Sequence, residues 1–261
     1  QRAKFITEIY TTMGVARREA RGVGEIKDLD IPSSHQSLIA VIKEDLALAQ
    51  EPRGLVESKI KLIVLLEGSS GIGKSTLLRA ILKDANYYLS SAAAPVNSKI
   101  YYEITGKSKD AIAIIKQAAA EGAVVVIDEW NVSEGARGGK RFEEFLNTLL
   151  DQATDIKPGF MILASQNSAG DLGRSSSSKA DLNRTHFLTY NDYSEKDLLE
   201  IANRYLDSAS ARIFVKDFYA ARAANPAINY RTFFETLAPQ PKSMRETKLG
   251  GGAAVLTSGA P

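Results

Sequence analysis

A glycine-rich stretch at residues 68–75 contains the residue types that can hold a polyphosphate. Its members are Gly68, Ser69, Ser70, Gly71, Ile72, Gly73, Lys74 and Ser75. Glycines lack a Cβ and tolerate positive φ, so consecutive backbone N–H groups can curl around a β-phosphate while the next helix directs its positive N-terminus at the anion. An apolar run at 62–67 precedes the stretch and a helical pattern follows it, as this phosphate-binding loop requires. The sequence therefore predicts a site for a nucleoside triphosphate.

Two side chains at the end of the loop are expected to contact the ligand directly. The Lys74 ammonium should reach the β- and γ-phosphates, and the Ser75 hydroxyl should be a ligand of Mg²⁺. Thr76, one position beyond the motif, is the alternative metal ligand and is counted with the nucleotide-binding residues. ATP and Mg²⁺ are therefore the expected cofactors.

Two adjacent carboxylates follow the apolar run at 124–127. Asp128 can hold Mg²⁺ through its water shell, whereas Glu129 can polarise the attacking water as the general base of γ-phosphate hydrolysis. Acidic residues at a strand end are often merely solvated, so this interpretation depends on the phosphate-binding loop in the same chain. The pair is therefore predicted to be catalytic, with Asp128 also in the metal site.

A third polar side chain, Asn167, lies just beyond the apolar run at 159–165. Neighbouring strand ends in parallel sheets face the ligand crevice, so an amide there can orient the lytic water. An asparagine at a strand end is as often a turn former, and the predicted catalytic role depends on its position alone.

Apolar runs and helical patterns alternate along most of the chain. The strand-like runs lie at 61–67, 99–104, 123–128, 159–165 and 185–190, and helical patterns lie at 35–50, 109–121 and 141–153. Five strands separated by helices predict an α/β fold of the P-loop NTPase kind, with a mostly parallel five-stranded sheet and helices on both of its faces.

After Tyr190 the pattern is helical only. Helices are predicted at 194–209, 210–224 and 229–237, and Ser194 with Asp197 nearly forms a capping box at the first of them. The residues from 239 on are rich in Pro, Gly, Ser and Ala. We therefore expect four parts: an N-terminal extension (1–34), a nucleotide-binding α/β domain (35–190), a small helical lid domain (191–238) and a flexible tail or linker (239–261).

The composition excludes several classes of function. Lys and Arg total 33 against 31 Asp and Glu, so the net charge is +2 and no global basic field points to nucleic acid. The absence of cysteine excludes disulfides, thiol catalysis and thiolate metal sites. No apolar run approaches the ~20 residues that span a bilayer, so we expect no membrane span and, for an ATP-dependent activity, a cytoplasmic location. The chain begins at Gln1 rather than Met, as a piece excised from a larger protein would.

The phosphate-binding loop, the Asp128-Glu129 pair, Asn167 and the C-terminal helices together resemble the AAA+ ATPases over about residues 25–238. Several short segments more narrowly resemble the branch that contains MoxR, McrB and midasin. These segments are Asp128-Glu129-Trp130-Asn131, Ala164-Ser165-Gln166-Asn167, Gly173-Arg174, Leu182-Asn183-Arg184 and Asn191-Asp192-Tyr193-Ser194. The resemblance implies an ATP site that a neighbouring subunit completes.

The resemblance also assigns roles to two arginines. Arg184 matches the arginine finger, which acts in trans, and Arg231 matches the sensor-2 arginine early in a lid helix. A guanidinium can offer two parallel donors to phosphate oxygens and stabilise the charge that develops in phosphoryl transfer. The alternative for both is an ordinary surface arginine. The family implies a homo-oligomeric ring, such as a hexamer, or attachment to other domains of a larger chain.

The leading hypothesis is an AAA+-type ATPase module that hydrolyses ATP with Mg²⁺ to drive conformational remodelling of an unidentified macromolecular partner. The first alternative is a nucleotide-dependent switch that turns over little. The second is a P-loop small-molecule kinase. Asn167 and a helical domain with Arg231 argue against the kinase, and Glu129 fits water activation better than hydroxyl phosphorylation.

Overall fold

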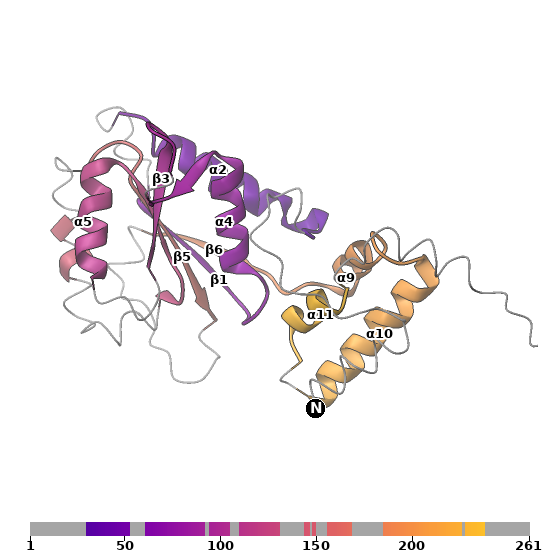
Figure 1. Ribbon diagram of the computed structural model, residues 1–261. Helices are drawn as coiled ribbons and strands as arrows, with labels where there is room; N and C mark the ends of the chain where they lie inside the picture. The colour runs from indigo at the N-terminus through magenta and orange to yellow at the C-terminus, as the bar shows by residue number, and fades with distance from the viewer. Residues whose placement is uncertain are drawn as a thin grey trace, which may run out of the picture. The chain divides into compact units, whose positions relative to one another are not determined.

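The computed structural model describes residues 30–52, 61–91, 94–104, 110–130, 144–146, 148–149, 156–168, 185–225 and 228–237 (Figure 1). These residues divide into two compact units, one ending at Ile201 and the other starting at Ala202. The sheet and the phosphate-binding loop belong to the first unit, and Arg231 belongs to the second. Each unit is described by itself below.

The centre of the first unit is a parallel sheet. Its strands are β1 (Ile63–Gly68), β2 (Tyr87–Leu89), β3 (Lys99–Ile104), β4 (Val124–Ile127), β5 (Met161–Asn167) and β6 (Thr185–Tyr190). In the part of the chain that the structure describes, they lie in the order β2-β3-β4-β5-β1-β6, and every neighbouring pair is parallel. The predicted α/β fold is confirmed, but the predicted number of five strands is wrong because β2 was missed. Three residues are too few to show a periodicity.

Strand register brings the carboxyl ends of three strands together. Gly68 at the end of β1 is paired with Asn167 of β5 on one side and with Tyr190 of β6 on the other. Ile127 of β4 is paired with Ala164 of β5, so Asp128 follows at the same edge of the sheet. All four residues of β4 are buried, as expected for a central strand covered on both faces.

Helices cover both faces of the sheet, as predicted. The described helices of the first unit include η2 (Ser33–His35), α2 (Gln36–Leu48), α4 (Lys74–Asp84) and α5 (Ala111–Glu121). Ile115 and Ala118 of α5 form a core with alternate strand residues such as Leu65 and Ile162, whereas α4 lies on the opposite face (Figure 1). Of the helix predicted over 141–153, residues 144–146 and 148–149 are helical and the others lie outside the described residues.

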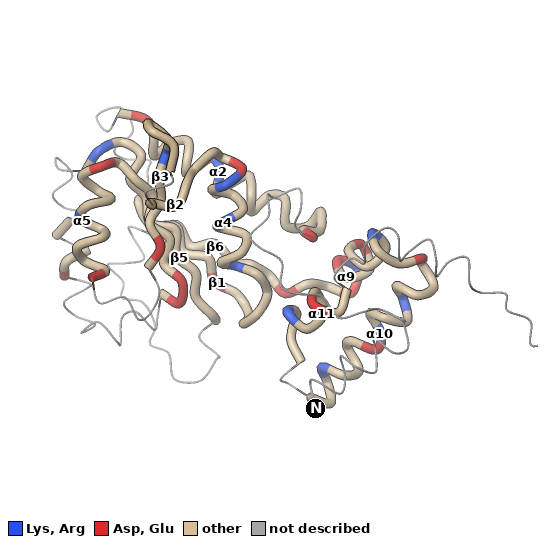
Figure 2. Tube along the Cα trace, in the orientation of Figure 1, with Lys and Arg blue, Asp and Glu red and all other residues tan. Residues whose placement is uncertain are grey.

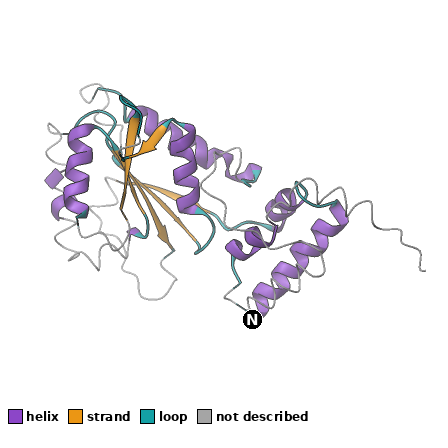
Figure 3. Cartoon of the chain, viewed as in Figure 1, coloured by secondary structure: helices purple, strands orange, loops and turns teal. Residues whose placement is uncertain are grey.

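Three helices follow the sheet: α9 (Glu195–Ala202), α10 (Ser208–Ala224) and α11 (Tyr230–Leu237) (Figure 3). The predicted capping box is confirmed, since Ser194 N donates to Asp197 at 2.9 Å and Asp197 N donates to Ser194 Oγ at 3.2 Å. The prediction of one helix over 194–209 is wrong. Asp207 instead caps a new helix by accepting bonds from the N–H groups of Ala209 and Ser210, each at 3.0 Å.

Aromatic packing forms the interior of the second unit. Phe218 of α10 meets Phe233 of α11 with ring centroids 5.0 Å apart, and both rings are buried. Basic and acidic residues are interspersed along the helices (Figure 2). No helix among the described residues combines the length and the apolar character that crossing a bilayer demands.

Candidate active site

The residues predicted to bind nucleotide lie at the carboxyl ends of the central strands, where parallel sheets hold their ligands. The phosphate-binding loop joins β1 to α4, Asp128 directly follows β4, and Asn167 is the last residue of β5. The structure brings Lys74 together with Asn167, and Ser75 together with Asp128. Four predicted site residues therefore meet at one place.

The loop has the backbone that its glycines were predicted to allow. Gly71 and Gly73 have φ values of 75° and 104°, in the left-handed region that favours glycine. Gly68 has a different constraint, because a Cβ built on it would lie 2.4 Å from the Tyr190 carbonyl oxygen. Helix α4 begins directly after Gly73, so the N–H groups of its first turn face the region where an anion would bind.

Lys74 is the buried cation of the site, with 6% of its surface exposed. Its Nζ donates to the carbonyl oxygens of Gly68 and Ser69 and to Oδ1 of Asn167, each at 2.8 Å. Because an ammonium only donates, the amide oxygen of Asn167 must be the atom that faces it, and the NH₂ group is directed elsewhere. Asn167 can therefore contact Lys74 and still offer donors to a phosphate or a water.

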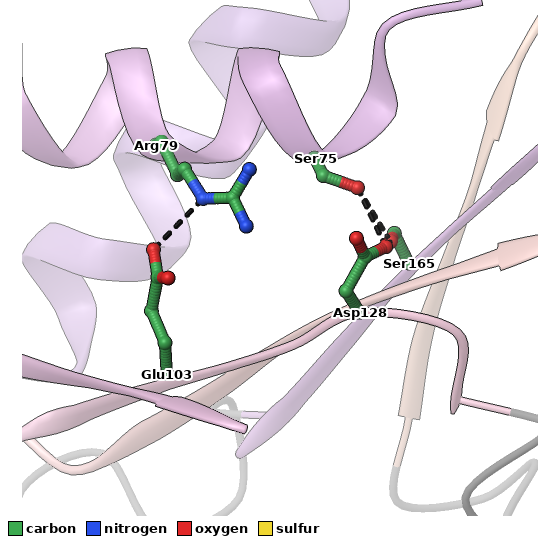
Figure 4. A network of polar contacts seen from close by, with 5 residues as sticks. All are labelled: Ser75, Arg79, Glu103, Asp128 and Ser165. Carbon is green, nitrogen blue, oxygen red and sulfur yellow. Dashed lines mark hydrogen bonds and ion pairs between the residues drawn. The ribbon is translucent and has the colours of Figure 1, made fainter. Parts of the chain in front are cut away.

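Asp128 accepts hydrogen bonds from the described residues on a single oxygen. Oδ1 receives Ser75 Oγ at 2.6 Å and Ser165 Oγ at 2.7 Å (Figure 4). It also receives the Glu129 N–H at 3.1 Å. Burial works to raise the pKa of Asp128, but the bonds from the two serines, the charge of Arg79 and the Glu129 N–H together outweigh it, and the pKa lies below its ordinary value. Asp128 is therefore a carboxylate at neutral pH, as a metal ligand must be.

Ser165 is a site residue to which the sequence analysis gave no role. Its side chain is buried, with 1% exposed, and its Oγ also lies 3.2 Å from Ser75 Oγ. Ser165 precedes Asn167 by two positions on β5, and side chains two apart on a strand share a face. A small polar residue on that face of a buried strand is the signal that could have identified it.

An ion pair beside Asp128 was also missed. Arg79 lies on α4 one turn after Ser75, and its Nε contacts Glu103 Oε1 of β3 at 2.8 Å (Figure 4). The positive charge of Arg79 contributes to the lowered pKa of Asp128. Because both partners are about a quarter exposed, the pair has a more important effect on the local field than on stability.

Glu129 has a strained backbone. Its φ is 58°, and a residue with a Cβ in this left-handed region costs about 1–2 kcal/mol. Its side chain is exposed, next to Asp128. Strain of this kind is concentrated at functional sites. The structure therefore places Glu129 at the edge of the site, where its predicted role as general base stays a prediction.

The roles of the two predicted arginines stay predictions. Arg184 lies outside them. Arg231 is exposed on α11, in the second unit. Thr76, the alternative metal ligand, is exposed on α4, whereas Ser75 contacts Asp128. Of the two candidate hydroxyls, Ser75 is therefore the better placed.

The oxygens present suit Mg²⁺. A serine hydroxyl and a carboxylate are hard donors, and a Mg²⁺ ion bound with a nucleotide needs only one or two carboxylates besides water and phosphate. The described residues contain no cluster of three or more His, Cys, Asp or Glu side chains that could hold a metal. Ser75 can ligate through a lone pair while its proton still donates to Asp128.

Comparisons with known proteins found one matching family model and similar solved structures. Residues 64–221 match the family model described as ATPase family associated with various cellular activities (AAA). A structure of C. elegans PCH-2 is similar, with 15% identity and a TM-score of 0.48; the match covers 67% of this chain and 47% of that one. A chain of the E. coli MS115-1 HORMA:CdnC:Trip13 complex is also similar, with 14% identity and a TM-score of 0.46; the match covers 81% of this chain and 91% of that one. No curated protein sequence matches significantly. Because the family match covers more than half of its length, this chain belongs to the AAA family of ATPases.

Proposed function

We propose that this chain is an AAA+-type ATPase module that hydrolyses ATP with Mg²⁺ to remodel a macromolecular partner. The observation that carries the proposal is the meeting of Lys74 with Asn167 and of Ser75 with Asp128, at the carboxyl ends of adjacent strands. Phosphoryl transfer depends on positioning and on charge stabilisation, and these four residues supply a cation, an amide and two oxygen ligands.

Each residue has a distinct task in this proposal. Lys74 leaves its carbonyl partners for the β- and γ-phosphates, and the backbone of 68–73 surrounds the β-phosphate. Ser75 and Asp128 would hold Mg²⁺, which would neutralise negative charge on the phosphates. Glu129 takes the proton of the attacking water, and Asn167 orients that water through its NH₂ group.

The wider organisation is part of the same proposal. Arg184 would complete a neighbouring subunit's site within a homo-oligomeric ring, and Arg231 would contact the nucleotide from the helical lid. The proposal also includes the domain limits, with the α/β domain at 35–190 and the lid at 191–238. It further includes membership of the MoxR, McrB and midasin branch and a cytoplasmic location. The family match supports ATP hydrolysis, and the partner is not identified.

The test is the ATPase rate measured against protein concentration, with mass determined by light scattering with and without ATP. We expect a specific activity that rises with concentration as subunits associate, and that is lost in Arg184→Ala without loss of ATP binding. A slow rate from a monomer, independent of concentration, would favour the alternative of a nucleotide-dependent switch. Phosphate transfer to a small acceptor instead of release into water would favour the kinase.

Ser165→Ala provides a test of the metal site. The change removes one of the three donors to Asp128 Oδ1, so the carboxylate is held less firmly. Residues that orient metal ligands typically contribute about 10–100-fold to metal affinity or activity. We expect about a tenfold increase in the Mg²⁺ concentration for half-maximal hydrolysis, and recovery in Ser165→Thr, which keeps the hydroxyl. A lower melting temperature of Ser165→Ala with an unchanged Mg²⁺ dependence would show that Ser165 contributes only to packing.

A further inference from the structure

A tyrosine outside the predicted site contacts a backbone carbonyl of the phosphate-binding loop. The Oη of Tyr193 donates to the carbonyl oxygen of Ile72 at 3.2 Å. Tyr193 lies between β6 and α9, in the first unit, and its side chain is buried with 4% exposed. We propose that Tyr193 is a positioning residue that holds the Ile72–Gly73 peptide in the orientation that phosphate binding requires. This inference rests on the proposed nucleotide site.

The geometry of the peptide bond explains how the Tyr193 hydroxyl can orient the Gly73 N–H. In a trans peptide the C=O of one residue and the N–H of the next point in opposite directions. Tyr193 draws the Ile72 oxygen out of the loop, so the Gly73 N–H is directed into it, where the backbone donors gather around phosphate. A flipped peptide would instead present the Ile72 oxygen to the anion and repel it.

The loop needs such a restraint because of its own glycine. Gly73 has a φ of 104°, a backbone conformation that residues with a Cβ rarely adopt. Glycine populates both signs of φ at little cost, which makes the peptide before it easy to turn. A single hydrogen bond to the Ile72 oxygen therefore opposes a movement that the loop sequence permits.

Counting protons shows which hydroxyl donates. A carbonyl oxygen only accepts, so the single proton of Tyr193 is used on Ile72. The 2.8 Å bond between the Tyr190 and Tyr193 hydroxyls must then be donated by Tyr190. Burial raises the pKa of Tyr190 and keeps it protonated, so it remains a donor. The two hydroxyls form a chain that ends on the loop.

Aromatic packing fixes the Tyr193 ring. The His35 ring lies 4.8 Å from Tyr190 and 5.2 Å from Tyr193 between centroids, and the two tyrosines meet edge to face. His35 is held in turn by the Asn191 carbonyl oxygen, 3.0 Å from Nε2. These residues come from η2, the end of β6 and the segment before α9. Tyr193 therefore connects the loop to the chain that leads into α9.

The experiment compares Tyr193→Phe with Tyr190→Phe. Each variant loses one buried hydroxyl and keeps its ring, but only the hydroxyl of Tyr193 donates to the loop, so Tyr190→Phe is the matched control for stability. Affinities for ADP, inorganic pyrophosphate and adenosine are measured by displacement of a fluorescent ADP analogue. Melting temperatures without ligand show whether the two variants fold equally well.

We expect Tyr193→Phe to bind ADP and pyrophosphate about 3- to 10-fold more weakly than the wild type, the range for one neutral hydrogen bond. The 3.2 Å distance is long for O–H···O, so the lower half of this range is the more specific expectation. Adenosine affinity should stay unchanged, and Tyr190→Phe should stay within twofold of the wild type for all three ligands.

Equal losses in both variants, or a loss that includes adenosine, would overturn the inference and assign Tyr193 to packing. Wild-type affinity in Tyr193→Phe would overturn it as well. The proposed function fails separately: a wild type that binds ADP but hydrolyses no ATP contradicts the ATPase and leaves the Tyr193 comparison valid. A wild type that binds neither ADP nor pyrophosphate would contradict both.

Discussion

The Lys74→Met variant is expected to lose all measurable affinity for ATP and ADP while it folds like the wild type. Methionine keeps an unbranched chain of similar length, so the packing of the stem is preserved and only the ammonium is removed. In the structure that ammonium has three oxygen partners within the site, at 2.8 Å each. Phosphates would replace them as partners, and no other described side chain contacts both the loop carbonyls and Asn167.

Ligand-induced stabilisation is the measurement for this prediction. A ligand present at 100 times its dissociation constant stabilises the folded state by about 2.7 kcal/mol, and the melting temperature rises accordingly. ADP should raise the melting temperature of the wild type and leave that of Lys74→Met unchanged. The unliganded melting temperature of the variant serves as its control for folding. An ADP-dependent rise in Lys74→Met would show that the nucleotide binds elsewhere.

The parts of the site that could be predicted from the sequence are those whose chemistry is local. The phosphate-binding loop requires glycines and Lys74-Ser75 at fixed offsets within one stretch, so its residues could be identified without a fold. Asp128 and Asn167 come just after the apolar runs at 124–127 and 159–165, and the rule that parallel strands present their carboxyl ends to the ligand was enough to place them together.

The parts that could not be predicted depend on which strands are neighbours. Ser165 is an unremarkable small residue until β5 lies beside β4 and the register puts its hydroxyl on Asp128. Tyr193 is separated by 121 positions from the Ile72 carbonyl that it contacts. The Arg79–Glu103 pair likewise joins α4 to β3 across the fold. Apart from the small polar residue two positions before Asn167, none of these contacts leaves a periodic or compositional signal.

The errors in the predicted strands and helices also have causes in the local sequence. Strand β2 has only three residues, Tyr87 to Leu89, and two of them are exposed, so it lacks both the length and the alternation of a recognisable strand. The helix predicted over 194–209 ends at Ala202 because Asp207 offers a side-chain cap to a new helix. An aspartate competes well for backbone N–H groups, which favours a helix start over a helix interior.

Glu129→Gln should separate binding from hydrolysis. The amide has the shape of the carboxylate and the same backbone preference at a φ of 58°, but it cannot take the proton of water. General-base catalysis typically contributes about 10²–10⁴-fold. We therefore expect kcat to fall by about that factor while the affinity for ATP is unchanged, so that the variant retains bound ATP. Hydrolysis at the wild-type rate would show that another group activates the water.

Glu129→Gly tests why a strained residue stands at this position. Glycine adopts a φ of 58° without the Cβ clash, so the variant should relieve about 1 kcal/mol of strain in the folded state, partly offset by the greater freedom of glycine in the unfolded chain. In a chain of this size 1 kcal/mol corresponds to about 2–4 °C in melting temperature. We expect Glu129→Gly to melt no lower than the wild type, and up to this much higher, while it loses hydrolysis as fully as Glu129→Gln. A lower melting temperature would mean that the contacts of the Glu129 side chain stabilise the fold by more than the strained backbone costs. The left-handed backbone would then serve stability rather than the placement of a base.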